Sequence, residues 1–314
     1  MNDTDRAGAP RLLVVGYGAA GRAYAGAFAA AGATVRAVDP QADPAAISQA
    51  GALGITLDTA LPATLEQTDL TIVLTPAAAS GAVLAGLGAL PGDGPILDLT
   101  SSAPDAMRAA AAQIGARFID GTVLGAVGLS GVATPMILAG PMAAQAAAML
   151  GPLGCRVTCL DQAEPGAASE LKLLRSVFMK GLEALFVELK LCAATLDHDD
   201  RLRLMLWDLG EVEMFGFLNE MLRTHPRHAE RRLHEVEAAG SMIAAHGLAT
   251  PMTEATRTLF ARSARAPDAA PGTPAAAPVP DTDPASALDW PPPRPEPRAP
   301  LIFTSIDPPN RRPS

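Results

Sequence analysis

The chain has 314 residues, of which 49% are hydrophobic, and a net charge of −9. Its length predicts two domains, and its acidic balance argues against nucleic acid as a partner. Residues 1–10 do not resemble a signal peptide and no apolar run is long enough to span a bilayer, so we expect a cytoplasmic protein without a membrane partner. The three cysteines lack metal-ligand spacing, and no metal is expected.

The first predicted element carries a nucleotide-binding pattern. A short apolar run, residues 11–15, leads into Gly16-x-Gly18-x-x-Gly21 and then into an alanine-rich helical stretch. The first glycine permits a tight turn, the second lets the backbone approach a pyrophosphate, and the third lets the helix pack on the strand. The alternative is a purely structural turn. We predict a dinucleotide site, to which we assign Gly16, Tyr17, Gly18, Ala19, Ala20 and Gly21.

A second predicted strand, residues 34–38, ends at Asp39. A carboxylate at this point can accept hydrogen bonds from the hydroxyls of the adenosine ribose. It would repel the 2′-phosphate of NADP, and no arginine follows within the next several residues. The sequence therefore predicts NAD as the cofactor, with NADP less favoured.

Strand-like and helix-like runs alternate from there to about residue 160. This alternation predicts an α/β fold with a Rossmann-type, doubly wound and largely parallel sheet. The further strand-like runs are residues 54–57, 70–74, 95–99, 117–119, 135–139 and 155–160.

The pattern changes near residues 161–166. One long amphipathic helix is predicted over residues 167–195, and further helices follow to about residue 265. We expect a nucleotide-binding domain over residues 1–165 and an all-helical domain for substrate binding and dimerisation over residues 166–265. Residues 266–314 hold fifteen of the 29 prolines, which predicts a disordered tail. A polyproline ligand, or a strap docked on the body, is the alternative for that tail.

Small and polar residues follow three of the strand-like runs, and parallel sheets place their chemistry at these carboxyl ends. We assign Leu74, Thr75 and Ser101 to the cofactor site. Thr100 and Ser101 could equally cap the helix expected next along the chain. The glycines of residues 121–131, which we expect after the sixth strand, indicate either a loop whose N–H groups hold an anionic or carbonyl group, or a plain turn.

Lys172 lies near the start of the long helix, with Arg175 and Ser176 on the same face. In a dry cleft, burial and the neighbouring cation would lower the pKa of this lysine towards the range useful for acid–base catalysis. A solvated lysine is the alternative. Lys180, two turns later, is either a second polar residue of a cleft or a surface residue.

Taken together, these motifs resemble those of the β-hydroxyacid dehydrogenase superfamily, which includes 6-phosphogluconate and 3-hydroxyisobutyrate dehydrogenases and the imine reductases. The resemblance covers about residues 10–264. Beyond the glycine motif, residues 98–104 resemble Asp-x-Ser-Thr-x-x-Pro, residues 120–126 resemble Asp-x-x-x-Ser-Gly-Gly, and residues 166–176 resemble Gly-x-x-x-x-x-Lys-x-x-x-Asn. Residues 171–188 and 228–235 are similar to the branch with a short, phosphogluconate-dehydrogenase-like helical domain.

The resemblance implies that Lys172 is the catalytic acid and base, with Ser176 and Ser101 orienting the substrate. Leu124 replaces the loop serine of the family, Ala126 replaces its second loop glycine, and Ser176 replaces its asparagine. The identity of the substrate is therefore not carried over. The residues expected to line the substrate are Leu124, Gly125, Ala126, Arg175 and Lys180.

The sequence thus predicts an NAD(P)-dependent dehydrogenase (EC 1.1.1.-) that transfers a hydride between nicotinamide and a small hydroxy acid or related carbonyl compound. Reduction of an imine is a second interpretation, disfavoured by Lys172. A non-catalytic NAD-binding sensor is a third, favoured by the lost loop serine. The wide apolar surface of residues 171–189 predicts a homodimer. His228, Arg231 and Arg232 either bind a substrate anion or belong to a solvated helix face.

Overall fold

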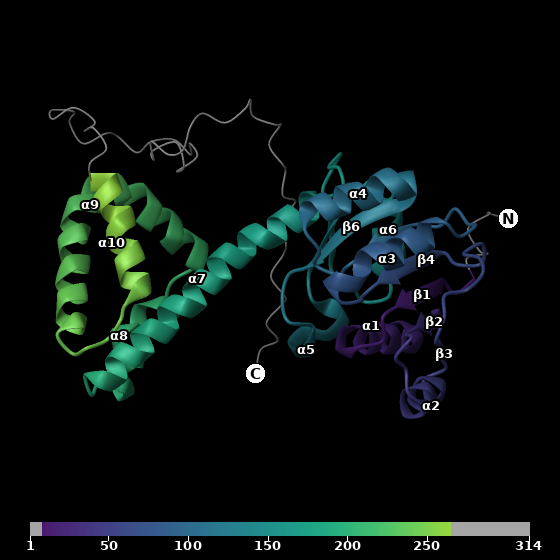
Figure 1. Cartoon of the computed structure of the whole chain (residues 1–314), viewed down its shortest axis with the longest axis horizontal. Helices are drawn as coiled ribbons and strands as arrows, with labels where there is room; N and C mark the ends of the chain where they lie inside the picture. The colour runs from purple at the N-terminus through teal and green to yellow at the C-terminus, as the bar shows by residue number, and fades with distance from the viewer. Residues whose placement is uncertain (1–7, 265–314) are drawn as a thin grey trace. The chain divides into compact units, whose positions relative to one another are not determined.

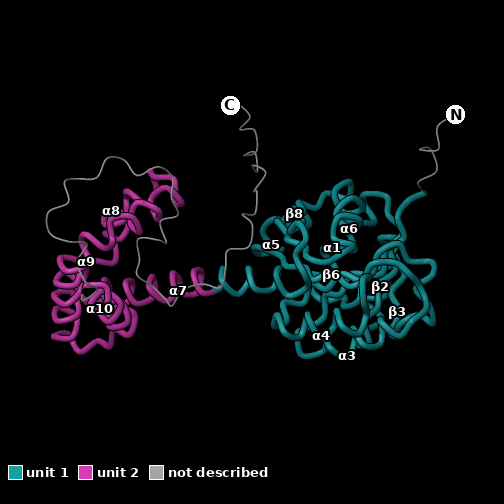
Figure 2. Tube along the Cα trace, turned by 90° about the horizontal axis from the view of Figure 1, so that it is seen from above, with its two compact units in different colours: residues 1–176, 300–314 teal, residues 177–299 magenta. Residues whose placement is uncertain are grey.

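The computed structural model describes residues 8–264, which form two compact units. Among these residues, unit 1 comprises residues 8–176 and unit 2 comprises residues 177–264. Figure 2 colours the units and places the division inside helix α7 (Ala167–Thr195), whereas the sequence led us to expect a boundary before this helix. The division lies inside the helix because the first turn of α7 is hydrogen-bonded to the sheet of unit 1. The proline-rich segment from residue 266 lies outside the described residues.

Unit 1 is built on an eight-stranded sheet in the order β3-β2-β1-β4-β5-β6-β7-β8. All neighbouring strands are parallel except β6 and β7. The order reverses between β1 and β4, which creates the switch point at which such sheets bind nucleotides. The predicted doubly wound, largely parallel sheet is confirmed. Its strands are β1 (Arg11–Val15), β2 (Thr34–Val38), β3 (Thr56–Asp58), β4 (Leu70–Val73), β5 (Ile96–Asp98), β6 (Phe118–Val123), β7 (Met136–Ala139) and β8 (Val157–Cys159).

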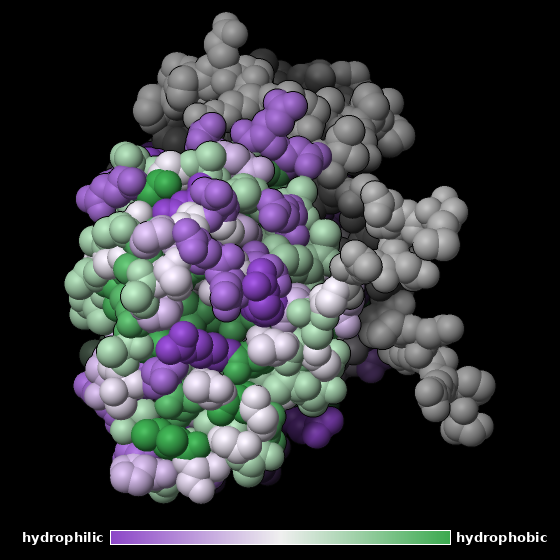
Figure 3. Space-filling view, turned by 90° about the vertical axis from the view of Figure 1, so that its right-hand side faces the viewer, coloured by the Kyte–Doolittle hydropathy of each residue, from purple (hydrophilic) through white to green (hydrophobic). Residues whose placement is uncertain are grey.

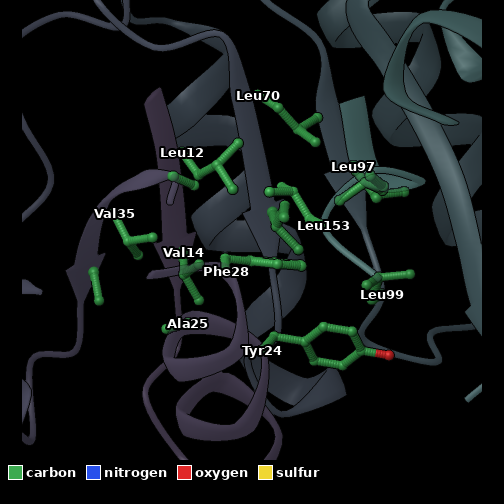
Figure 4. Close-up of a cluster of buried hydrophobic side chains, with 14 of the residues drawn as sticks. Leu12, Val14, Tyr24, Ala25, Phe28, Val35, Leu70, Leu97, Leu99 and Leu153 are labelled. Atoms are coloured by element: carbon green, nitrogen blue, oxygen red, sulfur yellow. The ribbon is translucent and has the colours of Figure 1, made fainter. Parts of the chain in front are cut away.

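Helices cover both faces of the sheet (Figure 1). Successive residues of β1 point to opposite faces. Leu12 and Val14 therefore join a core with α1 and α6, while Leu13 and Val15 join a core with α3 and α4. Figure 4 shows Tyr24 and other side chains of α1 among the strand residues of the first core. The helices are α1 (Ala19–Ala30), α2 (Pro44–Ala52), α3 (Ala77–Gly88), α4 (Pro104–Ile114), α5 (Val127–Ser130) and α6 (Ala143–Leu150).

One expectation about β6 is wrong. The sequence suggested that residues from Asp120 onward follow the sixth strand, but β6 continues through Val123 and pairs antiparallel with β7. The pairing satisfies the backbone groups of this buried stretch. A larger residue at Gly121 would force its neighbours to shift, because a Cβ atom would lie 2.5 Å from the Cδ1 atom of Leu97. The loop therefore begins at Leu124, whose N–H donates to the carbonyl of Pro135 over 2.8 Å.

Unit 2 is all helical, as predicted. The second part of α7 is followed by α8 (Leu202–Met205), α9 (Met214–Ala244) and α10 (Pro251–Ala264). Glu188 of α7 is buried and accepts hydrogen bonds from the N–H groups of Met252 and Thr253 at 2.7 and 2.9 Å. This carboxylate thus caps the start of α10 from a neighbouring helix. No helix within residues 8–264 has the length and apolar character needed to cross a membrane.

Candidate cofactor and catalytic site

The glycine motif forms the turn between β1 and α1. Gly16 has a φ of +99°, and a Cβ atom there would lie 2.8 Å from the carbonyl of Leu74. A Cβ atom on Gly21 would lie 2.0 Å from the carbonyl oxygen of Gly16, so this glycine allows the helix to approach the strand. At Gly18 the added atom would meet nothing within 4 Å. The motif therefore has two glycines required by packing and one that leaves open space before the N-terminus of a helix, where phosphates bind.

Asp39 follows β2 and lies beside this turn. One carboxylate oxygen, Oδ2, accepts a hydrogen bond from the N–H of Tyr17 at 3.0 Å, and the other, Oδ1, accepts one from the N–H of Gln41 at 2.9 Å. These contacts fix the carboxylate next to the glycine motif. Because each carboxylate oxygen has two acceptor sites, capacity for ribose hydroxyls remains.

The residues after β4 complete the predicted cofactor edge. Leu74 continues the ladder, since its N–H donates to the carbonyl of Val15 at 2.7 Å. The Oγ1 atom of Thr75 is buried and has no hydrogen-bond partner within the described part of the chain. Buried hydroxyls are normally paired, so a ligand group at this edge would satisfy it. The glycine motif, Asp39 and Thr75 together fit a bound dinucleotide.

Ser101, which follows β5, contacts the predicted catalytic lysine of α7. The Nζ atom of Lys172 donates a hydrogen bond to the Oγ atom of Ser101. Ser101 has a φ of +68°, a conformation that is uncommon for a residue with a side chain. Neither Thr100 nor Ser101 caps α4, because the N-cap residue of that helix is Ala103 and no side-chain hydrogen bond caps it. The structure therefore excludes the capping alternative and shows Ser101 in contact with Lys172.

The surroundings of Lys172 set the direction of its pKa. The side chain is half-buried, and this burial lowers the pKa below the ordinary value for lysine. The carboxylate of Asp98 acts in the opposite direction, Arg175 lowers the pKa further, and Asp120 raises it. The net decrease is in the direction expected from the sequence, and it makes the neutral amine more accessible.

The other predicted site residues are distributed as follows. Ser176 is half-buried and Arg175 is exposed, one turn after Lys172. Leu124 is half-buried at the start of its loop, where Gly125 and Ala126 are exposed. Lys180 belongs to unit 2 and forms an exposed ion pair with Glu183, with Nζ and Oε2 2.6 Å apart.

The sequence did not indicate the role of Asp120. This residue is completely buried, and its carboxylate accepts hydrogen bonds from the N–H groups of Gly166 and Ser169 and from the hydroxyl of Ser169. A signal was present, since an aspartate directly follows two apolar residues in each of two neighbouring segments of the sequence. Asp98 and Asp120 are that pair.

Two arginines of α9 make contacts inside unit 2. Arg231 forms an ion pair with Glu235 one turn away, and Arg232 donates to the hydroxyl of Thr224 at 2.9 Å. These contacts favour the solvated helix face over an anion site.

A groove of about 720 Å³ in the same unit is lined partly by Phe186 and other apolar residues, and it contains none of the predicted site residues. Within residues 8–264, no group of histidine, cysteine or acidic side chains could hold a metal ion.

Comparison with known families adds information about the helical part. Residues 195–263 match a family model described as a domain of unknown function (DUF1932). No curated protein matches the chain.

Several solved structures share the fold. A conserved hypothetical protein from Sinorhizobium meliloti 1021 is 28% identical, with a TM-score of 0.54, and the match covers 83% of this chain and 90% of that one. The conserved protein MTH1747, described as structurally similar to 3-hydroxyacid dehydrogenases, is 22% identical, with a TM-score of 0.55 and coverage of 81% and 96%. An imine reductase from Aspergillus terreus, in complex with NADPH4, is also 22% identical, with a TM-score of 0.69 and coverage of 82% and 94%.

Proposed function

We propose that this chain, which has the fold of the superfamily of 3-hydroxyacid dehydrogenases and imine reductases, is an NAD(P)-dependent oxidoreductase. Its substrate would be a small hydroxy acid or a related carbonyl compound. The observation that carries the proposal is the contact between Lys172 and Ser101 at the carboxyl edge of a sheet that also presents the glycine motif. Such an edge is where nucleotide-binding sheets carry out their chemistry.

Lys172 supplies the acid–base chemistry. When bound, a nicotinamide would accept or supply the hydride. In its neutral form the Lys172 amine takes the proton of the substrate hydroxyl, and in the reverse direction the ammonium returns it. The lowered pKa makes the neutral form available closer to neutral pH. Ser101, already bonded to the amine, would orient the substrate oxygen, and Ser176 would do so from one turn further along α7.

NAD is the cofactor that we propose, on the basis of Asp39. Its carboxylate is held in place by hydrogen bonds from the N–H groups of Tyr17 and Gln41, and in this position it would repel a 2′-phosphate. The nearby cation Arg36 is already paired with Asp58 at 2.6 Å. The imine reductase from Aspergillus terreus was solved with NADPH4, which supports NADP(H) instead. The charge at the end of β2 in this chain is what leads us to propose NAD.

Imine reduction is the second candidate, because an imine reductase has the same fold. The two candidates require different protonation states of Lys172. Alcohol oxidation needs a neutral base at this position, whereas imine reduction needs a proton donor. A non-catalytic nucleotide-binding protein is the third candidate, and it predicts binding of the cofactor without turnover of any substrate.

We also propose a homodimer formed through the helical unit. The α7 side chains of this unit include large apolar groups with high exposed fractions: Val177 74%, Phe178 45%, Leu182 45%, Phe186 47% and Leu191 60%. So many large, exposed apolar side chains on one helix are uncommon on a monomer. On the face of unit 1 drawn in Figure 3, by contrast, hydrophobic side chains are interspersed with hydrophilic ones. A second copy of the chain is the occupant that we propose for the apolar surface of α7.

The proposed function is tested with the purified full chain in two steps. Calorimetric titration with NADH and NADPH measures cofactor binding, and a panel of small hydroxy acids, carbonyl compounds and imines is then followed by the absorbance of reduced nicotinamide. We expect binding of NADH and turnover of at least one hydroxy acid, with turnover lost in Lys172→Ala and kept in the control Lys190→Ala. Lys190 is a suitable control because it is half exposed and paired with Asp199. Failure to bind either cofactor would refute the proposal, and binding without turnover would favour the non-catalytic candidate.

A further inference from the structure

Two buried carboxylates are hydrogen-bonded to the segments that carry Ser101 and Lys172. Asp98 of β5 and Asp120 of β6 are register partners in neighbouring parallel strands, so their side chains lie on the same face of the sheet. Asp98 is 1% exposed and Asp120 is 0% exposed. Burying two carboxylates side by side is costly unless both are well hydrogen-bonded, so their placement requires a physical reason.

Asp98 holds the turn that carries Ser101. Its Oδ1 atom accepts a hydrogen bond from the N–H of Thr100 at 2.6 Å, and its Oδ2 atom accepts one from the hydroxyl of Ser80 at 2.7 Å. The next residue, Ser101, has the left-handed φ of +68°. Such a conformation persists only when the surrounding structure determines it. The bond from Thr100 to Asp98 provides that constraint directly before Ser101.

Asp120 holds the start of the helix that carries Lys172. Its Oδ2 atom accepts hydrogen bonds from the N–H groups of Gly166 and Ser169, at 2.8 and 3.1 Å. Its Oδ1 atom accepts one from the hydroxyl of Ser169, at 2.7 Å. These are free donors of the first turn of α7, which a carboxylate from another element caps here. Lys172 lies three residues after Ser169, one turn along the helix.

We propose that Asp98 and Asp120 are paired positioning residues, which hold Ser101 and Lys172 in contact from two adjacent strands. Neither carboxylate bonds to the lysine or to the serine side chain, so each acts through the segment that it anchors. Because the strands are in register, the turn after β5 and the first turn of α7 are fixed relative to one another. The catalytic meaning of this pair rests on the proposed function, but the placement of Lys172 can be tested without any substrate.

The charges around Lys172 predict the direction in which its pKa should shift when one of them is removed. Asp98 and Asp120 on the sheet raise the pKa of Lys172, and Arg175 on its own helix lowers it. The ion pair between Arg108 of α4 and Glu170 of α7 lies near the same helix start. Removing the charge of Asp120 should therefore lower the pKa of Lys172, so that its amine becomes reactive at lower pH.

The reactivity of Lys172 can be measured separately, because the chain contains only three lysines, Lys172, Lys180 and Lys190. The full chain is treated with trace acetic anhydride over a range of pH, and acetylation of each lysine is measured by peptide mass spectrometry. Lys180 and Lys190 form exposed ion pairs and serve as internal standards.

Asp120→Asn removes the charge but can keep the contacts. The amide oxygen can still accept from the two N–H groups, while the amide nitrogen donates to the hydroxyl of Ser169. We expect the acetylation profile of Lys172 to move to lower pH, with the rate well below the original midpoint raised by about threefold or more. The matched control is Asp69→Asn, since Asp69 also accepts three hydrogen bonds, all from Arg11, at the opposite edge of the same sheet. In that control the profile should not move.

Ser169→Ala and Asp98→Asn test the anchoring itself. Ser169→Ala removes one hydrogen bond to Asp120 and leaves the two backbone bonds, so the fold should survive, which circular dichroism checks. Loss of the contact with Ser101 should raise the acetylation of Lys172 at high pH, because the amine becomes more accessible to the reagent. If Lys172 behaves in all three variants as in Asp69→Asn, the proposal is wrong. If the profiles move but no substrate is turned over, only the proposed function fails.

Discussion

Lys172 donates a hydrogen bond to Ser101 although the two residues are 71 positions apart in the chain. Ser101 follows a buried strand, and Lys172 lies in the first turns of a helix that begins well beyond the last strand of the sheet. Their contact joins an amine with a lowered pKa to a hydroxyl at the carboxyl edge of the sheet. This arrangement suits proton transfer to and from a substrate oxygen.

Replacing Lys172 should abolish most of the turnover while leaving the cofactor site intact. We expect Lys172→Ala to reduce kcat by roughly two to four orders of magnitude, because it removes the general base. NAD affinity, measured by calorimetry, should stay nearly unchanged. Lys172→Arg should not restore activity, since a guanidinium does not release its proton near neutral pH. Full turnover in Lys172→Ala would contradict the proposed mechanism.

The pH dependence of alcohol oxidation should report the lowered pKa of Lys172. Oxidation requires the neutral amine, so the rate should rise with pH and reach half its maximum below the ordinary pKa of lysine. Arg175 lowers this pKa, so Arg175→Ala should move the half-maximum to higher pH. The measurement is kcat/KM as a function of pH for both proteins. An unchanged or downward-shifted midpoint in the variant would show that the charge of Arg175 does not act on the base.

Asp39 should determine the choice between NAD and NADP. Its carboxylate lies beside the glycine motif and would repel a 2′-phosphate. In Asp39→Ala the preference for NAD should decrease, since both the ribose acceptor and the repulsion are lost. Calorimetric titration of both proteins with NADH and NADPH measures the change. Equal or tighter binding of NADPH by the unmodified chain would refute the assignment of NAD.

Leu124 should influence which substrates are accepted. It is half-buried at the start of the loop after β6, at the position where the family resemblance places a serine. An apolar side chain there favours a substrate with a hydrophobic or bulky group. We therefore expect Leu124→Ser to raise KM for such a substrate and to favour small, more polar hydroxy acids. A substrate profile identical to that of the unmodified chain would indicate that this loop does not line the pocket.

The dimer should depend on the apolar surface of α7. Light scattering at micromolar concentration is expected to give the mass of two chains. Val177→Glu should shift this mass towards one chain, because a charge is placed on an apolar surface that the second copy would bury. Leu53→Glu is the matched control, since Leu53 is 56% exposed in unit 1 and should not affect the mass. A monomer for the unmodified chain would overturn the proposal.

The sequence by itself determined the features that depend on local pattern. The glycine turn before α1 could be predicted because the spacing of Gly16, Gly18 and Gly21 between an apolar run and a helical stretch is a local pattern. The helix over residues 167–195 was predicted with its observed bounds, because an amphipathic period over many turns is a strong signal. The alternation of strands and helices indicated a parallel sheet for the same reason.

Tertiary structure alone decided which residues meet. Asp120 belongs to β6 rather than to a loop, since the strand continues by pairing with β7, and no local pattern encodes that partner. The register of Asp98 with Asp120, and the anchoring of α7 by Asp120, likewise depend on non-local hydrogen bonds. The contact of Lys172 with Ser101 follows from both. Local sequence sets the conformation of each segment, whereas the pairing of strands and the burial of polar groups set how the segments are brought together.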